Sequence, residues 1–153
     1  MFCAIVTGQA DAEIVLRSKQ FVAFLDTRPL FHGHVLVVPV VHVETFDQLP
    51  SELGGELVTI GQRMVRAVES AMEADGSLMI VNNIVSQSVP HLHLHVIPRT
   101  KQDGLRLWLG PRHRYRTTDE LATTGARIRA ALEGGGEVHA DDLDTSAQDR
   151  NSQ

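Results

Sequence analysis

The sequence predicts an α+β domain in which five strands form an antiparallel sheet and two helices accompany it. Short apolar runs of strand length are interspersed with only two longer segments whose apolar residues recur at helical spacing. Short connections join several of the runs, which favours antiparallel pairing. The chain has 153 residues, enough for one domain with a substantial core.

Three strands are expected first. The apolar runs at 14–17 and 21–25 flank a polar stretch at 18–20, as in a hairpin. The second run ends shortly before Pro29, and a third run at 35–38 ends at Pro39. Proline disfavours continued sheet pairing, so it sets the limits of these strands.

Two helices and two more strands follow. The first helix is expected to open at Pro50–Ser51 and to stop at Asp75–Gly76, and strands are expected at 78–81 and 91–97. Thr117 and Glu120 have the spacing of a capping box for the second helix. We expect the domain to span 1–133 and the acidic, apolar-poor residues 134–153 to form a disordered tail. The apolar face of the first helix consists of Leu53, Leu57, Ile60, Met64, Val68 and Met72.

Composition narrows the classes of function. The formal net charge of −5 argues against a protein that coats nucleic acid. Cys3 is the one cysteine, so an intramolecular disulfide is impossible. The N-terminal segment lacks the basic start and long apolar stretch of a signal peptide, and no apolar run approaches the ~20 residues that span a bilayer. We therefore expect a cytoplasmic protein with neither membrane nor nucleic-acid partners.

The segment most informative about chemistry is His91–Ile97, where three histidines alternate with apolar residues. On a strand, His91, His93 and His95 would point to one side and line a surface groove, while the leucines enter the core. Imidazole can serve as nucleophile, proton donor or phosphate ligand. From the triplet alone, catalysis, metal binding and a packed structural cluster all remain open.

This segment resembles the signature of the histidine triad family, His-φ-His-φ-His-φ-φ, where φ is apolar. Residues 33–39, Gly-His-Val-Leu-Val-Val-Pro, are similar to the family's upstream segment, and Asp26 precedes His34 by eight residues as its ribose-binding acid does. Residues 87–89 match the element just before the triad. The resemblance covers roughly residues 2–99 and implies the fold of that family.

By position, the resemblance implies that His93 is the nucleophile on an α-phosphate, that His95 binds this phosphate and that His91 supports His93. His34 is implied to join them from the neighbouring strand. Asp26 could instead only cap a turn, and Asn82, beside Asn83, could be only a turn residue. The implied substrate-binding residues are Asp26 for the ribose and Asn82, Gln87 and Ser88 for the phosphate or leaving group.

The chain also departs from the family pattern. The loop from Asn82 to Gln87 is shorter than the common version and lacks its glycines. Many relatives bind structural zinc through Cys-x-x-Cys and two histidines, of which only Cys3, His42 and His91 have counterparts here. Three ligands make a closed zinc site doubtful, so no metal is expected. Histidine at position 95, where the transferase branch has glutamine, is similar to the hydrolase branch.

The implied activity is hydrolysis of a purine nucleoside phosphate derivative through a covalent nucleotidyl-His93, without a cofactor. The leaving group is open: an amine, a lysyl group, a polyphosphate or a sulfate. Basic residues in 99–116 could bind a polyphosphate or form a solvated loop, and Trp108 could stack on a base, contact a neighbouring subunit or pack on the sheet. Relatives are homodimers, which would place the helix at 51–73 at the interface. A nucleotide-binding regulatory protein and a histidine-cluster metal protein are the alternatives, although Asp26, His34 and 87–88 argue against the metal protein.

Overall fold

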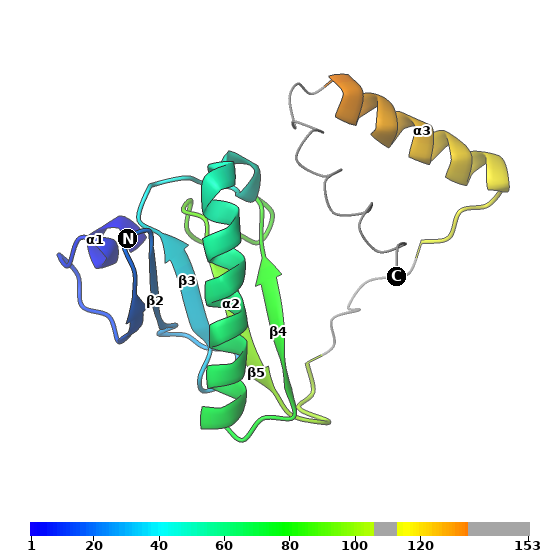
Figure 1. Cartoon of the computed structure of the whole chain (residues 1–153). Coiled ribbons are helices and arrows are strands. Elements are labelled where there is room, and N and C mark those ends of the chain that lie inside the picture. Colours follow the sequence, from blue (N-terminus) through cyan, green and yellow to red (C-terminus); the bar gives the residue numbers. More distant parts are fainter. Residues whose placement is uncertain (106–112, 135–153) are drawn as a thin grey trace, which may run out of the picture. The chain divides into compact units, whose positions relative to one another are not determined.

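The computed structural model describes residues 1–105 and 113–134 (Figure 1). Residues 1–105 and 106–153 form two compact units, which are described separately. The first unit carries the sheet, and the second contains α3. The elements are α1 (Phe2–Val6), β1 (Ile14–Arg17), β2 (Phe21–Leu25), β3 (Val35–Pro39), the 3₁₀ helix η1 (Phe46–Gln48), α2 (Ser51–Ala71), β4 (Gly76–Val81), β5 (Leu94–Arg99) and α3 (Thr118–Gly134).

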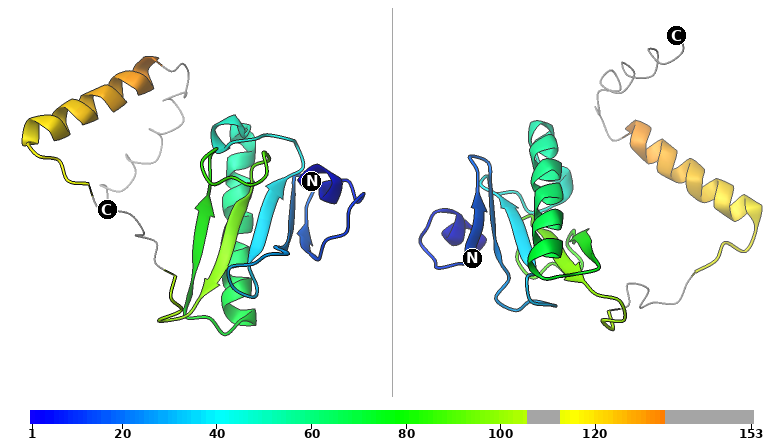
Figure 2. Two further views of the ribbon diagram at one scale, coloured as in Figure 1. Left: turned by 180° about the vertical axis from the view of Figure 1, so that it is seen from behind. Right: turned by 60° about the horizontal axis from the view of Figure 1, so that its bottom comes forward.

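The five strands form one antiparallel sheet in the order β1-β2-β3-β5-β4, which confirms the predicted fold class. Figure 2 shows this sheet from two further sides, with α1 near its β1 and β2 edge and β4 at the opposite edge. The β3–β5 pairing brings Leu36 opposite His95. This pairing places the upstream Gly-His segment beside the triad segment, although about 60 residues separate them in sequence.

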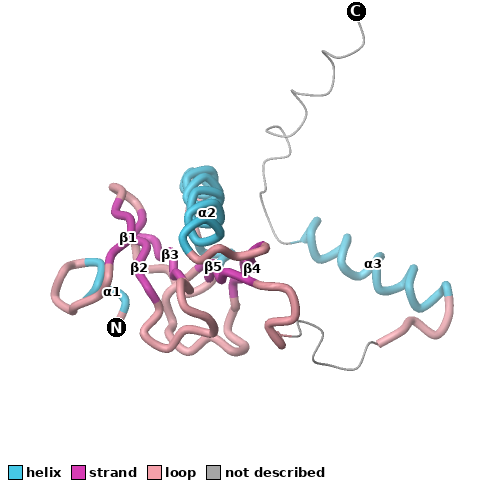
Figure 3. The backbone as a smooth tube through the Cα atoms, turned by 90° about the horizontal axis from the view of Figure 1, so that it is seen from below, coloured by secondary structure: helices cyan, strands magenta, loops and turns pink. Residues whose placement is uncertain are grey.

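One face of the sheet is covered by α2, as the view along the sheet in Figure 3 shows. Alternate strand residues enter this interface because successive side chains point to opposite faces of a sheet. Leu94 and Val96 lie in it, as predicted for the apolar residues of the triad segment. The buried residues of this core are Phe21, Ala23, Val35, Val37, Leu57, Ile60, Met64, Val68, Leu94 and Val96.

The opposite face carries a second apolar cluster beneath α1. Phe2, Ile5 and Val6 of α1 pack there against Val22 and Phe24 of β2 and the alternate residues of β3. The sequence did not predict α1, because a helix of five residues is too short to show helical periodicity. This short helix closes one side of the site described below.

Several predicted boundaries were wrong. Strand β4 begins at Gly76 instead of residue 78, and β5 ends at Arg99 instead of residue 97. The last strand begins at Leu94 rather than at His91, so His91–His93 are not part of a regular strand. Helix α2 ends at Ala71, before the predicted stop, because Glu73 adopts a left-handed φ of 51° that an α-helix does not accommodate.

In the second unit, α3 begins as the capping box predicts. The Glu120 backbone N–H donates to Thr117 Oγ1 at 3.1 Å, which satisfies one of the free donors of the first turn. No residue of α3 is buried. Residue 134, the first of the predicted tail, is the last residue of α3. The rest of the predicted tail, residues 135–153, lies outside the described residues, and so do Arg106, Trp108 and Arg112. Among the described helices, none combines the length and apolar character needed to cross a membrane.

Candidate active site

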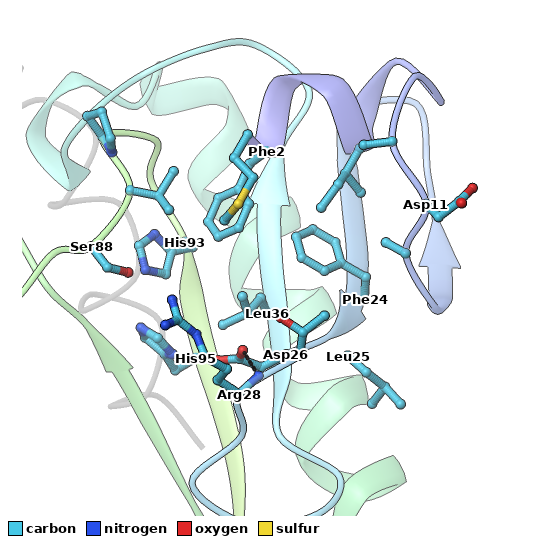
Figure 4. Close-up of a pocket in the computed structure, with 17 residues that line it drawn as sticks. Phe2, Asp11, Phe24, Leu25, Asp26, Arg28, Leu36, Ser88, His93 and His95 are labelled. Carbon is cyan, nitrogen blue, oxygen red and sulfur yellow. Dashed lines mark hydrogen bonds between the residues drawn. The ribbon is translucent and has the colours of Figure 1, made fainter.

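A pocket of about 630 Å³ opens on the α1 side of the sheet, a size suited to a nucleotide (Figure 4). It is lined by the start of the chain, by the turn that follows β2 and by the segment leading into β5. Its apolar part includes Phe2, Ile5, Phe24 and Leu36. Its polar part contains Asp26, Arg28, Ser88, His93 and His95.

His93 is held in one tautomer by the backbone. Its Nδ1 lies 2.7 Å from the carbonyl oxygen of His91, which can only accept, so Nδ1 carries the proton. The other ring nitrogen, Nε2, is therefore left with its lone pair. The ring is 3% exposed, lines the pocket and packs edge-on against Phe2 at a centroid distance of 5.2 Å. A neutral imidazole fixed in this way presents a nucleophilic nitrogen.

His95 is oriented by His34. Nε2 of His34 lies 2.9 Å from Nδ1 of His95, and the backbone N–H of Leu30 donates to Nδ1 of His34 at 3.3 Å. Because Leu30 can only donate, the proton of a neutral His34 sits on Nε2 and is donated to His95. The proton of His95 then sits on its own Nε2. This atom is buried and has no hydrogen-bond partner within the described residues, which is unusual for a buried donor.

Burial keeps both of these histidines neutral at pH 7. The pKa of His95 is lowered to about 4, mainly by desolvation and in smaller part by positive charge on His93 and His34, against the raising effect of the Asp26 carboxylate. Desolvation also lowers the pKa of His34, although the carboxylate of Asp26 opposes this effect. Asp26 Oδ2 lies 3.5 Å from Nδ1 of His34. The pair therefore offers a hydrogen bond toward the pocket without adding a positive charge.

Asp26 and Ser88, two of the four residues predicted to bind substrate, line the pocket. Oδ1 of Asp26 accepts the backbone N–H of Arg28 at 2.8 Å, which fixes the turn after β2. Asp26 thus caps a turn and faces the pocket at once, so the two predicted readings are compatible.

Gln87 and Asn82 are placed differently. Nε2 of Gln87 donates to the carbonyl of Glu44, and its Oε1 accepts from the backbone of Ile84, so Gln87 ties two loops together and does not line the pocket. Asn82 does not line it either, and neighbouring Asn83 accepts the backbone N–H of Phe46. Their predicted contacts with phosphate stay predictions.

The expectation that all three triad histidines line one groove was wrong for His91. This side chain is 1% exposed and does not line the pocket. Its Nε2 donates to the carbonyl of Pro39 at 3.0 Å, so its Nδ1 keeps a lone pair. The alternation rule failed because the segment 91–93 precedes the strand.

Nδ1 of His91 instead faces Cys3 and His42. Cys3 Sγ lies 3.5 Å from Nδ1 of His91 and 3.3 Å from Nδ1 of His42, and the three atoms could share one metal ion. Thiolate and imidazole are zinc ligands, and the bond from His91 to Pro39 is the kind of outer contact that orients a zinc-bound histidine. These residues fit three of the four ligands of a structural zinc, which would tie α1 to the sheet. Within residues 1–105 and 113–134, the three triad histidines do not bring their ring nitrogens within 4.8 Å of one another as a shared metal would require.

Phe2 and Arg28 are among the pocket residues that the sequence analysis did not single out. Phe2 lies in a helix too short to recognise, and Arg28 follows Asp26 in a turn where a cation is unremarkable. The sequence pointed instead to the basic residues of the segment 99–116. There Arg99 is bound to the carboxylate of Asp103 and to the carbonyl of Leu105. The position of Arg28, two residues after Asp26, is the signal in the sequence that could have found it.

Comparisons with known proteins place this geometry in a family. The model of the HIT domain matches residues 7–102. An uncharacterised HIT-like protein of Mycobacterium tuberculosis is 37% identical over 134 residues, which are 86% of this chain and 92% of that protein. An adenosine 5′-monophosphoramidase of Saccharomyces cerevisiae is 30% identical over 88% of this chain and 83% of its own length. An adenylylsulfatase of Arabidopsis thaliana is 30% identical over 69% of this chain and 54% of its own length.

Solved structures agree. A zinc-bound histidine triad family protein of Mycobacterium smegmatis matches 88% of this chain and 96% of its own, with 33% identity and a TM-score of 0.65. A protein of Streptococcus mutans matches 86% of this chain and 84% of its own, with 28% identity and a TM-score of 0.79. The adenylylsulfatase and the phosphoramidase are thus similar to 69% and 88% of this chain, and the chain belongs to the HIT domain family.

Proposed function

We propose that this protein hydrolyses the α-phosphate linkage of a purine nucleoside phosphate derivative through a covalent nucleotidyl-His93. The observation that carries the proposal is the convergence of two nitrogens with opposite roles. The lone pair of His93 Nε2 and the free N–H of His95 Nε2 belong to rings 4.7 Å apart that line the same pocket. One nitrogen attacks phosphorus, and the other donates to a phosphate oxygen.

The reaction has two steps. Nε2 of His93 forms a bond to the α-phosphorus, and the bond from phosphorus to the leaving group breaks. Positive charge that develops on the ring is shared through Nδ1–H with the carbonyl of His91, 2.7 Å away. Water then attacks the phosphorus, the N–P bond breaks, and the mononucleotide leaves with His93 neutral again. Each step is an easier displacement than direct attack by water.

The rest of the pocket suits the nucleoside. Phe2 and Phe24 pack edge-to-face with centroids 5.4 Å apart and offer an apolar wall to a base. Asp26 lies between this wall and His95, where its carboxylate can accept two ribose hydroxyls (Figure 4). The preference for purine follows the named relatives, whose substrates are adenosine derivatives.

A homodimer is part of this proposal. Strand β4 is an edge of the sheet, and Met79 on it is 42% exposed. Val58 on α2 is 58% exposed. An unpaired strand edge beside exposed apolar side chains favours pairing with a second copy, with α2 at the interface. Sedimentation or light scattering would report the mass, and a monomer at micromolar concentration would contradict this part of the proposal.

The experiment compares wild type with His93→Asn. Adenosine 5′-phosphoramidate, a lysyl-adenylate mimic, diadenosine tetraphosphate and adenosine 5′-phosphosulfate are supplied in turn. We expect wild type to release AMP from at least one of them and the variant to lose about 10³-fold or more in kcat. Rapid quenching in alkali should trap radioactive adenylate on wild type only. The exposed His32→Asn, two residues from His34, is the control for a general effect of losing an imidazole.

Two other functions make different predictions for the same experiment. A nucleotide-binding regulatory protein would bind AMP tightly in both forms and turn nothing over. A metal-binding protein would lose its fold when its metal is chelated, and its nucleotide affinity would be negligible. Turnover that survives His93→Asn would contradict the covalent route and leave nucleotide hydrolysis by another nucleophile.

A further inference from the structure

Arg28 is the single arginine or lysine side chain among the residues that line the pocket. It stands in the turn after β2, and its backbone N–H donates to Oδ1 of Asp26 at 2.8 Å. Figure 4 shows its side chain extending from this turn into the pocket on the side of His93 and His95. The same turn therefore supplies the pocket with a carboxylate and a guanidinium.

The guanidinium of Arg28 is available to a ligand. Within residues 1–105 and 113–134, no carboxylate forms an ion pair with it and no side-chain hydrogen bond engages it. Arg99 provides the contrast, because Asp103 occupies its guanidinium from two sides. An arginine directed into a nucleotide-sized pocket without a protein partner is suited to bind a phosphate or sulfate group.

His34 and His95 cannot supply this charge. Burial lowers the pKa values of His34 and His95, so both are neutral at pH 7. An α-phosphate already carries negative charge, and a second anionic group attached to it needs a cation close to the same atoms. Arg28 has the charge and the position to provide one.

We propose that Arg28 binds the leaving group, and that the substrates of this enzyme carry an anionic leaving group, a sulfate or a polyphosphate, on the α-phosphate. This inference rests on the proposed function and names its substrate class. As Nε2 of His93 bonds to phosphorus, the bond from phosphorus to the bridging oxygen breaks. The electron pair stays on that oxygen, and the group departs as an anion paired with Arg28.

The chemistry of departure separates this class from amines. A sulfate or phosphate leaves without taking a proton, so a fixed cation is sufficient to assist it. An amine leaves only after it gains a proton, and a protonated amine is repelled by a guanidinium. The neutral His95 donates a hydrogen bond and is a poor source of that proton.

The test measures kcat/KM for adenosine 5′-phosphosulfate, diadenosine tetraphosphate and adenosine 5′-phosphoramidate with wild type, Arg28→Gln and Arg28→Lys. Loss of a charge-assisted hydrogen bond should lower the ratio of anionic to phosphoramidate kcat/KM by about 10- to 100-fold in Arg28→Gln. Arg28→Lys keeps the charge but lacks the planar guanidinium, so its ratio of anionic to phosphoramidate kcat/KM should lie between those of wild type and Arg28→Gln. Whichever anionic substrate loses more identifies sulfate or polyphosphate as the source. Arg127→Gln on the exposed helix α3 is the matched control.

Three outcomes would overturn the inference while the proposed function stands: wild type hydrolyses only the phosphoramidate, Arg28→Gln lowers all three values equally, or it lowers none. An equal loss of kcat/KM for all three substrates would mean that Arg28 binds the α-phosphate or stabilises the fold. If wild type hydrolyses nothing, the proposed function itself fails. A second measurement avoids turnover: in the His93→Asn background, adding Arg28→Gln should weaken binding of adenosine 5′-phosphosulfate or diadenosine tetraphosphate more than binding of the phosphoramidate, and equal affinities would count against the inference.

Discussion

Nε2 of His34 lies 2.9 Å from Nδ1 of His95, and this hydrogen bond determines which nitrogen of His95 carries the proton that faces the pocket. The Leu30 backbone fixes the other side of His34 at 3.3 Å. The backbone N–H of Leu30 thus sets the tautomer of His34, and His34 in turn sets the tautomer of His95. His34 acts through His95, so it is a positioning residue.

Replacing His34 with alanine should lower kcat by about 10- to 100-fold, because His95 would be free to place its proton on either nitrogen. KM should change less, since the nucleoside wall is untouched. Steady-state kinetics on a substrate that the wild type hydrolyses would measure the effects on kcat and on KM separately. Glutamine at this position can still donate to His95 and should recover part of the loss, which a purely structural role would not predict. A loss confined to KM would contradict the positioning role.

Stability should fall as pH decreases from 6.5 to about 4. The folded-state pKa of His95 is lowered from 6.5 to about 4, and that of His34 is lowered too. In this window the unfolded chain binds protons that the folded chain does not bind, so the free energy of unfolding decreases as pH falls. The contribution of His95 to the free energy of unfolding is fully present above pH 6.5. It is lost as pH falls through about 4, and the loss amounts to about 3 kcal/mol.

Urea unfolding at pH 7.5 and pH 5 would measure this difference. His95→Asn removes the titrating group, so the difference in unfolding free energy between the two pH values should shrink relative to wild type. Exposed His32→Asn should leave it unchanged. Equal pH dependence in wild type and His95→Asn would mean that His95 titrates normally in the folded protein.

Zinc should raise the melting temperature of the wild type. Cys3, His42 and His91 bring one ligand atom each within 4.8 Å of one another, and a ligand that binds only the folded state stabilises it. Cys3→Ser should lose most of this shift and the zinc content measured after dialysis. The alternative outcome, a zinc shift that is the same in Cys3→Ser, would exclude these three residues as the binding site.

Gly33→Ala should destabilise the fold by about 1–3 kcal/mol. Gly33 has a φ of +87°, and a Cβ there would lie 2.5 Å from Cγ and 2.6 Å from Sδ of Met72. The substitution therefore combines a strained backbone with a clash next to His34. Gly54→Ala is the matched control, because nothing lies within 4 Å of its added Cβ and alanine favours the helix. Denaturant unfolding should show the two variants moving in opposite directions.

The sequence by itself determined the strands, the main helix and the candidate nucleophile. Runs such as 14–17 and 21–25 match their strands residue for residue, because local apolar patterning and proline positions set these limits. The triad segment, the Gly-His segment and Asp26 pointed to one family because their spacing is a property of the chain. No long-range contact is needed to recognise such a pattern.

Only the tertiary structure determined which histidines pair beside the pocket and which one lies against Cys3 and His42. Pairing of β3 with β5 brings His34 onto His95, while His91 turns to Cys3 and His42, which are distant in sequence. The tertiary structure also places Arg28 at the pocket and Gln87 between two loops. These outcomes depend on the direction of individual side chains outside regular strands. Local periodicity does not encode that direction, because contacts between segments far apart in the chain fix it.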